Sequence, residues 1–287
     1  MPELPEVETI KRSLAHEIVN KKIKNIWIEP SFKKKIFPNT EKFVKFLTGK
    51  KFAPVERRAK MLIFGVGKKD FVLTHLKMTG QLVYGPKRGQ AIGGGHNLDQ
   101  EKQPNRFTRA RFNFVDGSTL YYNDMRKFGF MKLLSQAELK GELAKYGPEP
   151  FDKEFTFKYF QSVLAKRRNQ RIKTVLMDQQ LIAGVGNIYA DEICFAARVH
   201  PETRVKSLRA GKVRALFSVI KKILTKAVKH RGTSVNTYVD GAGQAGGYQR
   251  FLNVYDRQGE KCYRCGAIIK KIKLGGRSSS FCPNCQK

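Results

Sequence analysis

Apolar residues recur at helical spacing near the start of the chain and then give way to short alternating stretches. Between Pro5 and about Asn20, apolar side chains recur every three or four positions, which predicts a helix with one buried face. The apolar stretches after this helix are short and are separated by turn-forming residues. They predict strands over residues 22–29, 51–56, 61–67, 70–76 and 81–85.

Two more alternating segments flank the pair Asp116-Gly117 within residues 110–124. An Asp-Gly pair predicts a tight hairpin in which both turn residues take positive φ. Residues 1–135 are therefore predicted to form a β-sandwich domain with a leading helix. Residues 85–105 have three consecutive glycines and no periodicity, so we interpret them as a mobile surface loop and assign no site to them.

The second half of the chain changes to helical periodicity. Helices are predicted over residues 156–167, 172–182, 187–199 and 212–232. We therefore expect an α+β fold with a linker at 136–150, a helical domain at 151–252 and a small cysteine-bearing module at 253–287. Within the helical domain, residues 233–248 form a glycine-rich loop.

The net charge of the chain indicates which class of molecule it binds. It has 56 lysines and arginines against 24 acidic residues, a net charge of +32, which favours a polyanion such as nucleic acid. A membrane partner is not expected, because the sequence has no apolar run of about 18 residues and no secretory signal pattern. The expected compartment is therefore intracellular.

The cysteines predict a metal site. Cys262 and Cys265 form one Cys-x-x-Cys pair, and Cys282 and Cys285 form a second one sixteen residues later. Two such pairs complete the tetrahedral thiolate shell of one zinc ion, and a shell with four protein ligands is structural and not catalytic. Cys194 lies in an apolar helical segment and is expected to be a small core residue.

Other motifs leave alternatives open. The segment GVGNIYA at 184–190 matches a dinucleotide fingerprint, but no strand precedes it, so we interpret it as a turn before a helix where Asn187 meets a phosphate. In the segment NDMRKFG, Arg126 and Phe128 are either a solvated charge beside a core ring or a wedge for a base stack. For His75 the sequence leaves two interpretations equally open, a core residue or a phosphate contact.

Seven ordered motifs together resemble the formamidopyrimidine-DNA glycosylase family. They are PELPEVET, RRAK, HLKMTG, DMRKFG, YGPEPF, IKTVLMDQQLIAGVGNIYADE and GGRSSSFCPNCQK, and they span nearly the whole chain. The resemblance implies a helix-two-turns-helix element in the helical domain and a four-cysteine zinc finger at the end.

The resemblance also implies a reaction. In that family the initiating Met is removed, and the amine of the following Pro attacks the anomeric carbon, expels the damaged base and forms a Schiff base. Pro2 stands at that position, and Glu3 stands at that of the general acid/base. Three other active-site residues are implied. Glu6 is a carboxylate near the reacting groups, and Lys60 is linked with β-elimination. Arg277 binds phosphate and is linked with δ-elimination.

The implied DNA contacts fall into three groups. Met78, Arg126 and Phe128 match residues that fill the space left by an extruded nucleotide. Phe107 stands where many relatives carry a DNA-contacting His, so that contact is expected to pass to Arg106 or Arg109. The remaining positions are the phosphate contacts Arg168, Lys173 and Asn187, together with Thr233, Ser234 and Tyr248 in or beside the loop that closes over an extruded purine.

The function expected from the resemblance is a bifunctional DNA glycosylase and abasic-site lyase for oxidised purines, 8-oxoguanine and formamidopyrimidines. The expected partner is double-stranded DNA with oxidised bases or abasic sites, bound by a monomer in the bacterial cytoplasm. One alternative is an oxidised-pyrimidine glycosylase of the same superfamily. The other is a catalytically silent zinc protein that binds damaged DNA.

Overall fold

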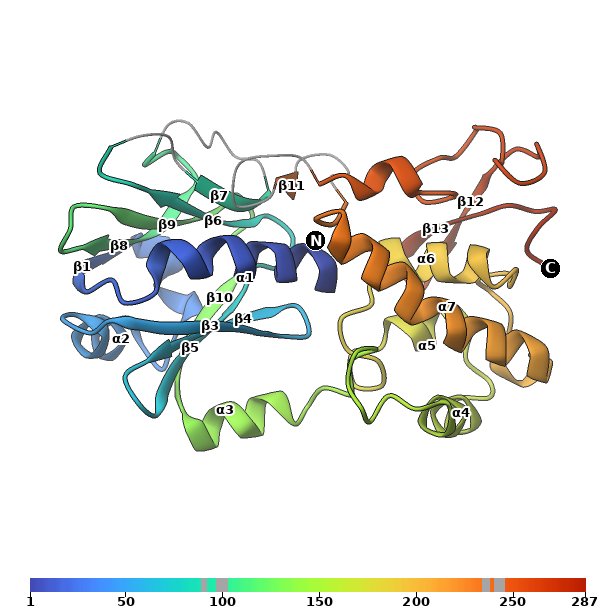
Figure 1. Cartoon of the computed structure of the whole chain (residues 1–287), viewed down its shortest axis with the longest axis horizontal. Coiled ribbons are helices and arrows are strands. Elements are labelled where there is room, and N and C mark those ends of the chain that lie inside the picture. The colour runs from blue at the N-terminus through green and yellow to red at the C-terminus, as the bar shows by residue number, and fades with distance from the viewer. Residues whose placement is uncertain (89–91, 97–102, 234–237, 240–245) are drawn as a thin grey trace. The chain divides into compact units, whose positions relative to one another are not determined.

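The computed structural model describes residues 1–88, 92–96, 103–233, 238–239 and 246–287 (Figure 1). The chain divides into two units, one made of residues 1–144 with 230–247 and one made of residues 145–229 with 248–287. Each unit has its own core, and each is described by itself.

The first unit begins with helix α1 (Leu4–Ile18), as the apolar spacing predicts. Its apolar stripe, Val7, Ile10, Leu14 and Ile18, is fully buried. The unit also contains α2 (Thr40–Leu47), α3 (Gln136–Leu143) and the 3-10 helix η1 (Pro30–Lys35). Its strands are β1 (Ile23–Ile28), β2 (Ile36–Phe37), β3 (Phe52–Arg58), β4 (Met61–Val66), β5 (Asp70–His75), β6 (Gly80–Gly85), β7 (Ile92–His96), β8 (Thr108–Phe114), β9 (Thr119–Asp124), β10 (Phe130–Ser135) and β11 (Tyr238–Val239).

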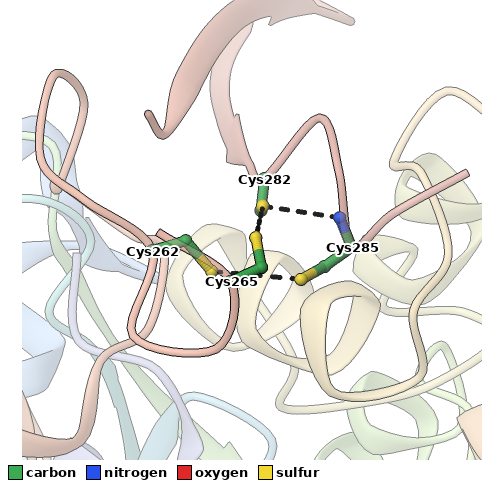
Figure 2. A group of neighbouring side chains, drawn as sticks. All are labelled: Cys262, Cys265, Cys282 and Cys285. Carbon is green, nitrogen blue, oxygen red and sulfur yellow. Dashed lines mark hydrogen bonds between the residues drawn. The ribbon is translucent and has the colours of Figure 1, made fainter. Parts of the chain in front are cut away.

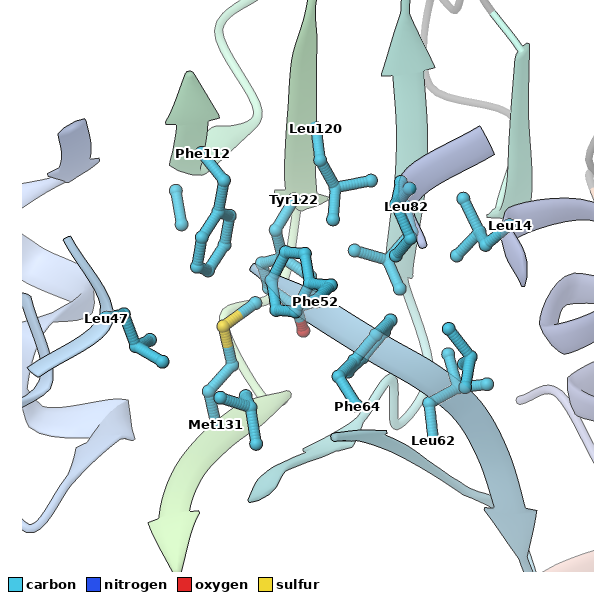
Figure 3. Close-up of a cluster of buried hydrophobic side chains, with 14 of the residues drawn as sticks. Leu14, Leu47, Phe52, Leu62, Phe64, Leu82, Phe112, Leu120, Tyr122 and Met131 are labelled. Atoms are coloured by element: carbon cyan, nitrogen blue, oxygen red, sulfur yellow. The ribbon is translucent and has the colours of Figure 1, made fainter. Parts of the chain in front are cut away.

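These strands form two sheets, with the orders β1-β8-β9-β6-β7-β11 and β2-β10-β5-β4-β3. Every pair is antiparallel except β2 with β10. Side chains from both sheets meet in one core, where the ring centroid of Phe52 on β3 lies 5.9 Å from that of Phe112 on β8 (Figure 3). Leu14 of α1 and Leu47 of α2 belong to the same core. The predicted α+β fold with an N-terminal β-sandwich is therefore confirmed.

Some local predictions for this unit are wrong. Of the pair Asp116-Gly117, only Gly117 has a positive φ, at +87°, because the hairpin loop has four residues instead of two. The backbone nitrogen of Gly117 donates to Phe114 O, and that of Phe114 donates to Ser118 O. Residues 92–96, interpreted as part of a loop, form β7 and pair with β6.

Two α-helices of this unit were not predicted. Helix α2 begins after Asn39, whose side chain accepts a hydrogen bond from the Lys42 nitrogen. Helix α3 lies within residues 136–150, which the sequence predicts to be a linker. It begins after Ser135, whose hydroxyl and amide both contact the Glu138 carboxylate. This S-x-x-E pattern is a start signal that the sequence already contains.

The second unit is helical and ends in a small hairpin. Its elements are α4 (Phe157–Lys166), α5 (Ile172–Met177), α6 (Asn187–Ala196), η2 (Val205–Ser207), α7 (Ala210–Lys229), η3 (Tyr248–Phe251), β12 (Lys270–Leu274) and β13 (Arg277–Phe281). The helix predicted over residues 172–182 ends at Met177. Residues 178–186 then form two turns around Gln179, whose side chain binds Met177 O, Val185 O and the Gly184 nitrogen.

Candidate functional site

The start of the chain is buried and tied to a distant segment. Pro2 and Glu3 precede α1, and both are buried. The Glu3 backbone nitrogen donates to Glu6 Oε2 at 2.8 Å, and the Thr233 nitrogen donates to Glu6 Oε1 at 2.8 Å. Gly232 has φ +76°, and a Cβ there would lie 2.6 Å from Glu6 Oε1, so glycine is required. The carboxylate of Glu6 thus joins the first residues of the chain to the residue where the glycine-rich loop begins.

The residues of that loop are only partly described. Thr233 is buried, whereas Ser234 lies outside the described residues, as do 235–237 and 240–245. Tyr248 belongs to the second unit, where it is 3% exposed and its ring centroid lies 5.7 Å from that of Tyr189. Burial raises the pKa of Tyr248, so its hydroxyl stays protonated at neutral pH.

Lys60 follows Ala59 in the two-residue turn between β3 and β4, and its side chain is buried. Nearby, His75 is 8% exposed, and its Nδ1 accepts a hydrogen bond from the Lys77 nitrogen at 2.9 Å. Burial, with the charges of Lys77 and Lys60, lowers the pKa of His75 to about 3. His75 is therefore neutral at physiological pH, and its ring packs 5.7 Å from that of Phe130. Of the two readings left open, the structure favours the core residue over the phosphate contact.

Met78, Arg126 and Phe128 lie together on the surface of the first unit. Met78 and Phe128 are 45% and 47% exposed, which is unusual for large apolar residues. The Arg126 guanidinium lies between them, with Nη1 3.1 Å from Met78 Sδ and its carbon 4.6 Å from the centre of the Phe128 ring. The sequence grouped these residues through motifs almost 50 positions apart, and the fold brings them into contact.

Buried Asp124 holds the loop that carries Arg126 and Phe128. Its Oδ1 accepts hydrogen bonds from the Thr79 hydroxyl and from the Arg126 nitrogen, and its Oδ2 accepts one from the Gly129 nitrogen at 2.8 Å. A Cβ on Gly129 would lie 1.7 Å from the Tyr122 hydroxyl, so no other residue fits there. Asp124 was not predicted from the sequence, although a lone acid before a charged loop tip is a signal for such a role.

Replacing Asp124 with Asn is expected to destabilise the first unit by about 1–3 kcal/mol. An amide offers only one acceptor oxygen, so its NH2 group would face a backbone donor that the carboxylate now satisfies. Urea unfolding measures the effect. The matched control is Asp116→Asn in the exposed hairpin, where the paired group is Lys21 and a loss below about 1 kcal/mol is expected. Equal losses in the two variants would contradict the assigned role.

Arg109 does not present its guanidinium freely to a ligand. The side chain is 8% exposed, and its Nε donates to the Asp124 backbone oxygen at 2.9 Å. This contact fixes the strand end before the loop of Arg126. The expectation that Arg109 binds DNA is replaced by a role in supporting that loop. Arg106 stacks on the Phe107 ring, with its guanidinium carbon 4.7 Å from the ring centre.

In the second unit, the two turns around Gln179 place Asn187 at the first position of α6. Its Oδ1 is buried and has no hydrogen-bond partner among the residues that the structure describes. The positive end of a helix is suited to an anionic oxygen, and in the Asn187 side chain only the Nδ2 group, not Oδ1, can donate to one. Arg168, the other predicted phosphate contact in this region, is exposed.

Lys173 is buried and belongs to an internal ion pair. Its Nζ lies 2.7 Å from Asp191 Oδ1 and donates to Ser278 O at 3.0 Å. Asp191 also accepts hydrogen bonds from the Ser279 hydroxyl and the Ser280 nitrogen. Burial raises the pKa of Asp191 to about 6, although the charge of Lys173 opposes that shift. The expectation of a phosphate contact for Lys173 is therefore replaced by a structural role that holds β13 against α6.

Asp191 and its neighbour Glu192 were both missed from the sequence. The carboxylate of Glu192 accepts hydrogen bonds from the backbone nitrogens of Asn253, Val254 and Tyr255. Two adjacent acids within an otherwise apolar helix are the signal, because buried carboxylates require donors. Together they attach the C-terminal hairpin module to α6. Arg277, at the first position of β13, is exposed.

The four predicted ligand cysteines converge at the base of this module (Figure 2). Their sulfur atoms all lie within 4.8 Å of one another, and the Cys265–Cys282 and Cys262–Cys285 separations are 3.4 and 4.0 Å. Tetrahedral zinc with Zn–S bonds of about 2.3 Å requires sulfur separations of about 3.8 Å, so the cluster has the right size. Cys194 is fully buried elsewhere, and burial raises the pKa of its thiol, as expected of an inert core residue.

Three family models match the chain. One described as the formamidopyrimidine-DNA glycosylase N-terminal domain matches residues 1–131, and one described as the formamidopyrimidine-DNA glycosylase H2TH domain matches residues 146–239. A third, described as a zinc finger found in FPG and IleRS, matches residues 259–287. With the clustered cysteines, this match identifies one structural zinc site, as the sequence predicts.

Similar proteins align over their whole length. The formamidopyrimidine-DNA glycosylase of Bacillus cereus is 38% identical over 289 residues, which cover 100% of this chain and 99% of that protein. That of Ligilactobacillus salivarius is 39% identical over the same share of each chain.

Solved structures agree with these relatives. A complex between the Lactococcus lactis Fpg and abasic-site DNA has a TM-score of 0.87 at 37% identity and covers 99% of both chains. A complex of that protein with oxidised-pyrimidine DNA has a TM-score of 0.86 at 37% identity and covers 100% of both. None of the helices in the described part of this chain is long and apolar enough to cross a bilayer.

Proposed function

Because this chain belongs to the formamidopyrimidine-DNA glycosylase family, we propose that it is a bifunctional glycosylase and abasic-site lyase. The family predicted from the sequence motifs is thereby confirmed, and so is the coarse activity, that of a DNA glycosylase acting on damaged DNA in DNA repair. The finer proposal is that it removes 8-oxoguanine and formamidopyrimidines from duplex DNA, within the bacterial cytoplasm, as a monomer.

The proposed nucleophile is the amine of Pro2 after removal of Met1. While Met1 is attached, the Pro2 nitrogen is a tertiary amide without a nucleophilic lone pair. A free α-amine has a pKa of about 7.7–8.0, so a useful fraction is unprotonated near neutrality. The amine attacks C1′, and the bond from C1′ to the base breaks. The amine then loses its proton and the C1′–O4′ bond opens, which leaves a Schiff base at C1′ and a hydroxyl at C4′. Glu3 is the proposed general acid/base for the proton transfers at the sugar.

Strand cleavage is proposed to follow by two eliminations. In the first, a proton leaves C2′, a double bond forms between C2′ and C3′, and the 3′ phosphate departs with its electron pair. In the second, a proton leaves C4′, a double bond forms between C4′ and C5′, and the 5′ phosphate departs with its electron pair. Lys60 is proposed to serve the first elimination and Arg277 to bind phosphate for the second.

The single observation that carries the proposal is the set of contacts around Glu6. This buried carboxylate binds the nitrogen of Glu3 on one side and that of Thr233 on the other. It joins the residue proposed for proton transfer to the start of the loop proposed to cover an extruded base. A purely structural helix start needs no such link to a segment 227 residues away.

The surface of the first unit supports extrusion of the target nucleotide. Met78, Arg126 and Phe128 form an exposed cluster of suitable chemistry for insertion into a base stack. Arg126 is proposed to face the orphaned base, which is usually cytosine in the family. In the second unit, Asn187, Arg168 and Arg277 are proposed to bind backbone phosphates, which the net charge of +32 favours.

Borohydride trapping tests the proposal. Protein that lacks Met1 is expected to form a covalent complex with duplex DNA carrying 8-oxoguanine opposite cytosine. The Pro2→Gly variant is expected to trap far less, because a flexible primary amine replaces the ring-constrained secondary amine. If this variant traps as efficiently as the wild type, the nucleophile is another amine, with Lys60 the first to examine.

The same experiment separates the alternatives. The structure of the Lactococcus lactis protein has been solved with oxidised-pyrimidine DNA. This observation supports an oxidised pyrimidine as a second candidate substrate. More efficient trapping on a thymine glycol duplex would make pyrimidine lesions the main substrate. Absence of adduct on both duplexes would leave a non-catalytic protein that binds damaged DNA.

A further inference from the structure

Glu8 and Arg57 form an ion pair beside the proposed catalytic residues, and neither has a role in the reaction described above. We propose that this pair positions Lys60 relative to Pro2 and Glu3 and so controls the elimination step. The inference rests on the proposed function for its enzymatic consequence. The structural part of the inference, that the pair positions Lys60, rests only on contacts within the first unit.

Arg57 contacts both α1, which directly follows Pro2 and Glu3, and the turn that carries Lys60. Its Nε lies 3.0 Å from Glu8 Oε2, and its Nη1 donates to the Ala59 backbone oxygen at 2.9 Å. Glu8 belongs to α1, the helix that starts directly after Pro2 and Glu3. Ala59 is the residue before Lys60. One planar guanidinium with donors at fixed angles therefore joins the nucleophile's helix to the turn of the lysine.

The turn needs this support because its backbone is strained. Ala59 has φ +54°, a left-handed conformation that favours glycine, yet it carries a Cβ and is fully buried. Arg58 pairs with Met61 across β3 and β4, so Ala59 and Lys60 alone make the reversal. A carbonyl fixed at Ala59 sets the peptide plane that leads into Lys60. That plane fixes the N–Cα bond of Lys60, which is where the placement of its side chain begins.

Glu8 remains ionised in this setting. Its side chain is 12% exposed, and burial alone would raise its pKa. Hydrogen bonds from Lys11, Arg57 and Arg12 outweigh burial, so the pKa of Glu8 is lowered. A lasting negative charge keeps the Arg57 guanidinium in place. Arg12 contacts the same carboxylate at 2.8 Å, but its side chain is 62% exposed.

Arg57→Lys tests the pair. The ammonium keeps the positive charge but lacks the planar guanidinium that donates to Glu8 and to Ala59 O at the same time. On duplex DNA with an abasic site, borohydride trapping of the Schiff base is expected to stay within about threefold of the wild type. Single-turnover strand cleavage is expected to slow about tenfold, as for the loss of one positioning hydrogen bond. Arg12→Lys is the matched control, and both of its rates are expected to be unchanged. Equal slowing of both steps, or of neither, in Arg57→Lys would overturn the inference.

A measurement on the free protein separates this inference from the proposed function. Isotope-labelled lysine observed by NMR at the ε-carbon gives a Lys60 signal, assigned by its loss in Lys60→Gln. That signal is expected to shift in Arg57→Lys and to stay in place in Arg12→Lys. An unmoved signal overturns the positioning role whatever the enzyme does. Conversely, a wild type that forms no adduct refutes the proposed function, while the NMR result still decides whether the pair positions Lys60.

A second variant keeps the inference testable if Arg57→Lys does not fold, which thermal unfolding would reveal. Glu8→Gln keeps the shape of the side chain and removes only the charge that holds Arg57. We again expect strand cleavage to slow while Schiff-base trapping is nearly unchanged, and the Lys60 signal to shift. Both effects are expected to be smaller than in Arg57→Lys. Unchanged cleavage together with an unmoved signal in Glu8→Gln would count against the proposal.

Discussion

Glu3→Gln is expected to slow base release by about 10²- to 10⁴-fold, the range typical of losing a general acid/base. The amide has nearly the same shape as the carboxylate but does not exchange a proton with the sugar. The Glu3 backbone nitrogen keeps its hydrogen bond to Glu6 Oε2, so the start of α1 is expected to stay folded. Single-turnover release of 8-oxoguanine from a duplex with cytosine opposite measures the effect.

Binding must be measured separately to interpret that loss. The affinity of Glu3→Gln for a duplex with an uncleavable abasic analogue is expected to stay within a few-fold of the wild type, since contacts made only in the transition state do not affect binding. Glu17→Gln, in the last turns of the same helix, is the matched control and is expected to leave base release unchanged. A parallel loss of affinity and rate in Glu3→Gln would show that Glu3 holds DNA or the fold, and would refute the acid/base role.

Loss of zinc is expected to unfold residues 259–287 and to weaken DNA binding by at least about 100-fold, since structural zinc contributes about 10–16 kcal/mol to folding of such modules. The core of the module is small: Val254, Cys262, Ile269 and Cys282 pack on Phe195, and Ala267 and Cys285 pack against them. Three of these residues are themselves zinc ligands. Without the ion, so few apolar side chains do not offset the loss of chain entropy. Arg277 on β13 then loses its defined position.

Cys282→Ser tests this prediction, with zinc content, resistance to protease and DNA affinity as the readouts. The matched control is Cys194→Ala, which removes a fully buried sulfur of α6 that is not a ligand. This control is expected to keep its zinc and its DNA affinity. If Cys282→Ser binds a full equivalent of zinc and DNA with wild-type affinity, then the four-cysteine site is not what holds the module together.

Motifs along the chain grouped some residues that the structure brings together and assigned others a role that their contacts do not fit. Met78, Arg126 and Phe128 were grouped by family resemblance, and they are in contact. Lys173 was expected to contact phosphate and Arg109 to contact DNA, yet both are buried: Lys173 is paired with the Asp191 carboxylate, and Arg109 donates to the backbone oxygen of Asp124. A positive residue in a matching motif does not reveal whether an acid or a backbone carbonyl elsewhere in the fold already binds it.

The sequence alone determined the features that depend on neighbours a few positions apart. The stripe of α1 follows from helical spacing, and each Cys-x-x-Cys pair follows from two thiolates on one tight turn. Only the tertiary structure decided the contacts of Glu6 with Thr233 and of Arg57 with Glu8, which join residues 227 and 49 positions apart. Such contacts depend on how the sheets and helices pack, because a side chain's partners are set by which surfaces are buried together.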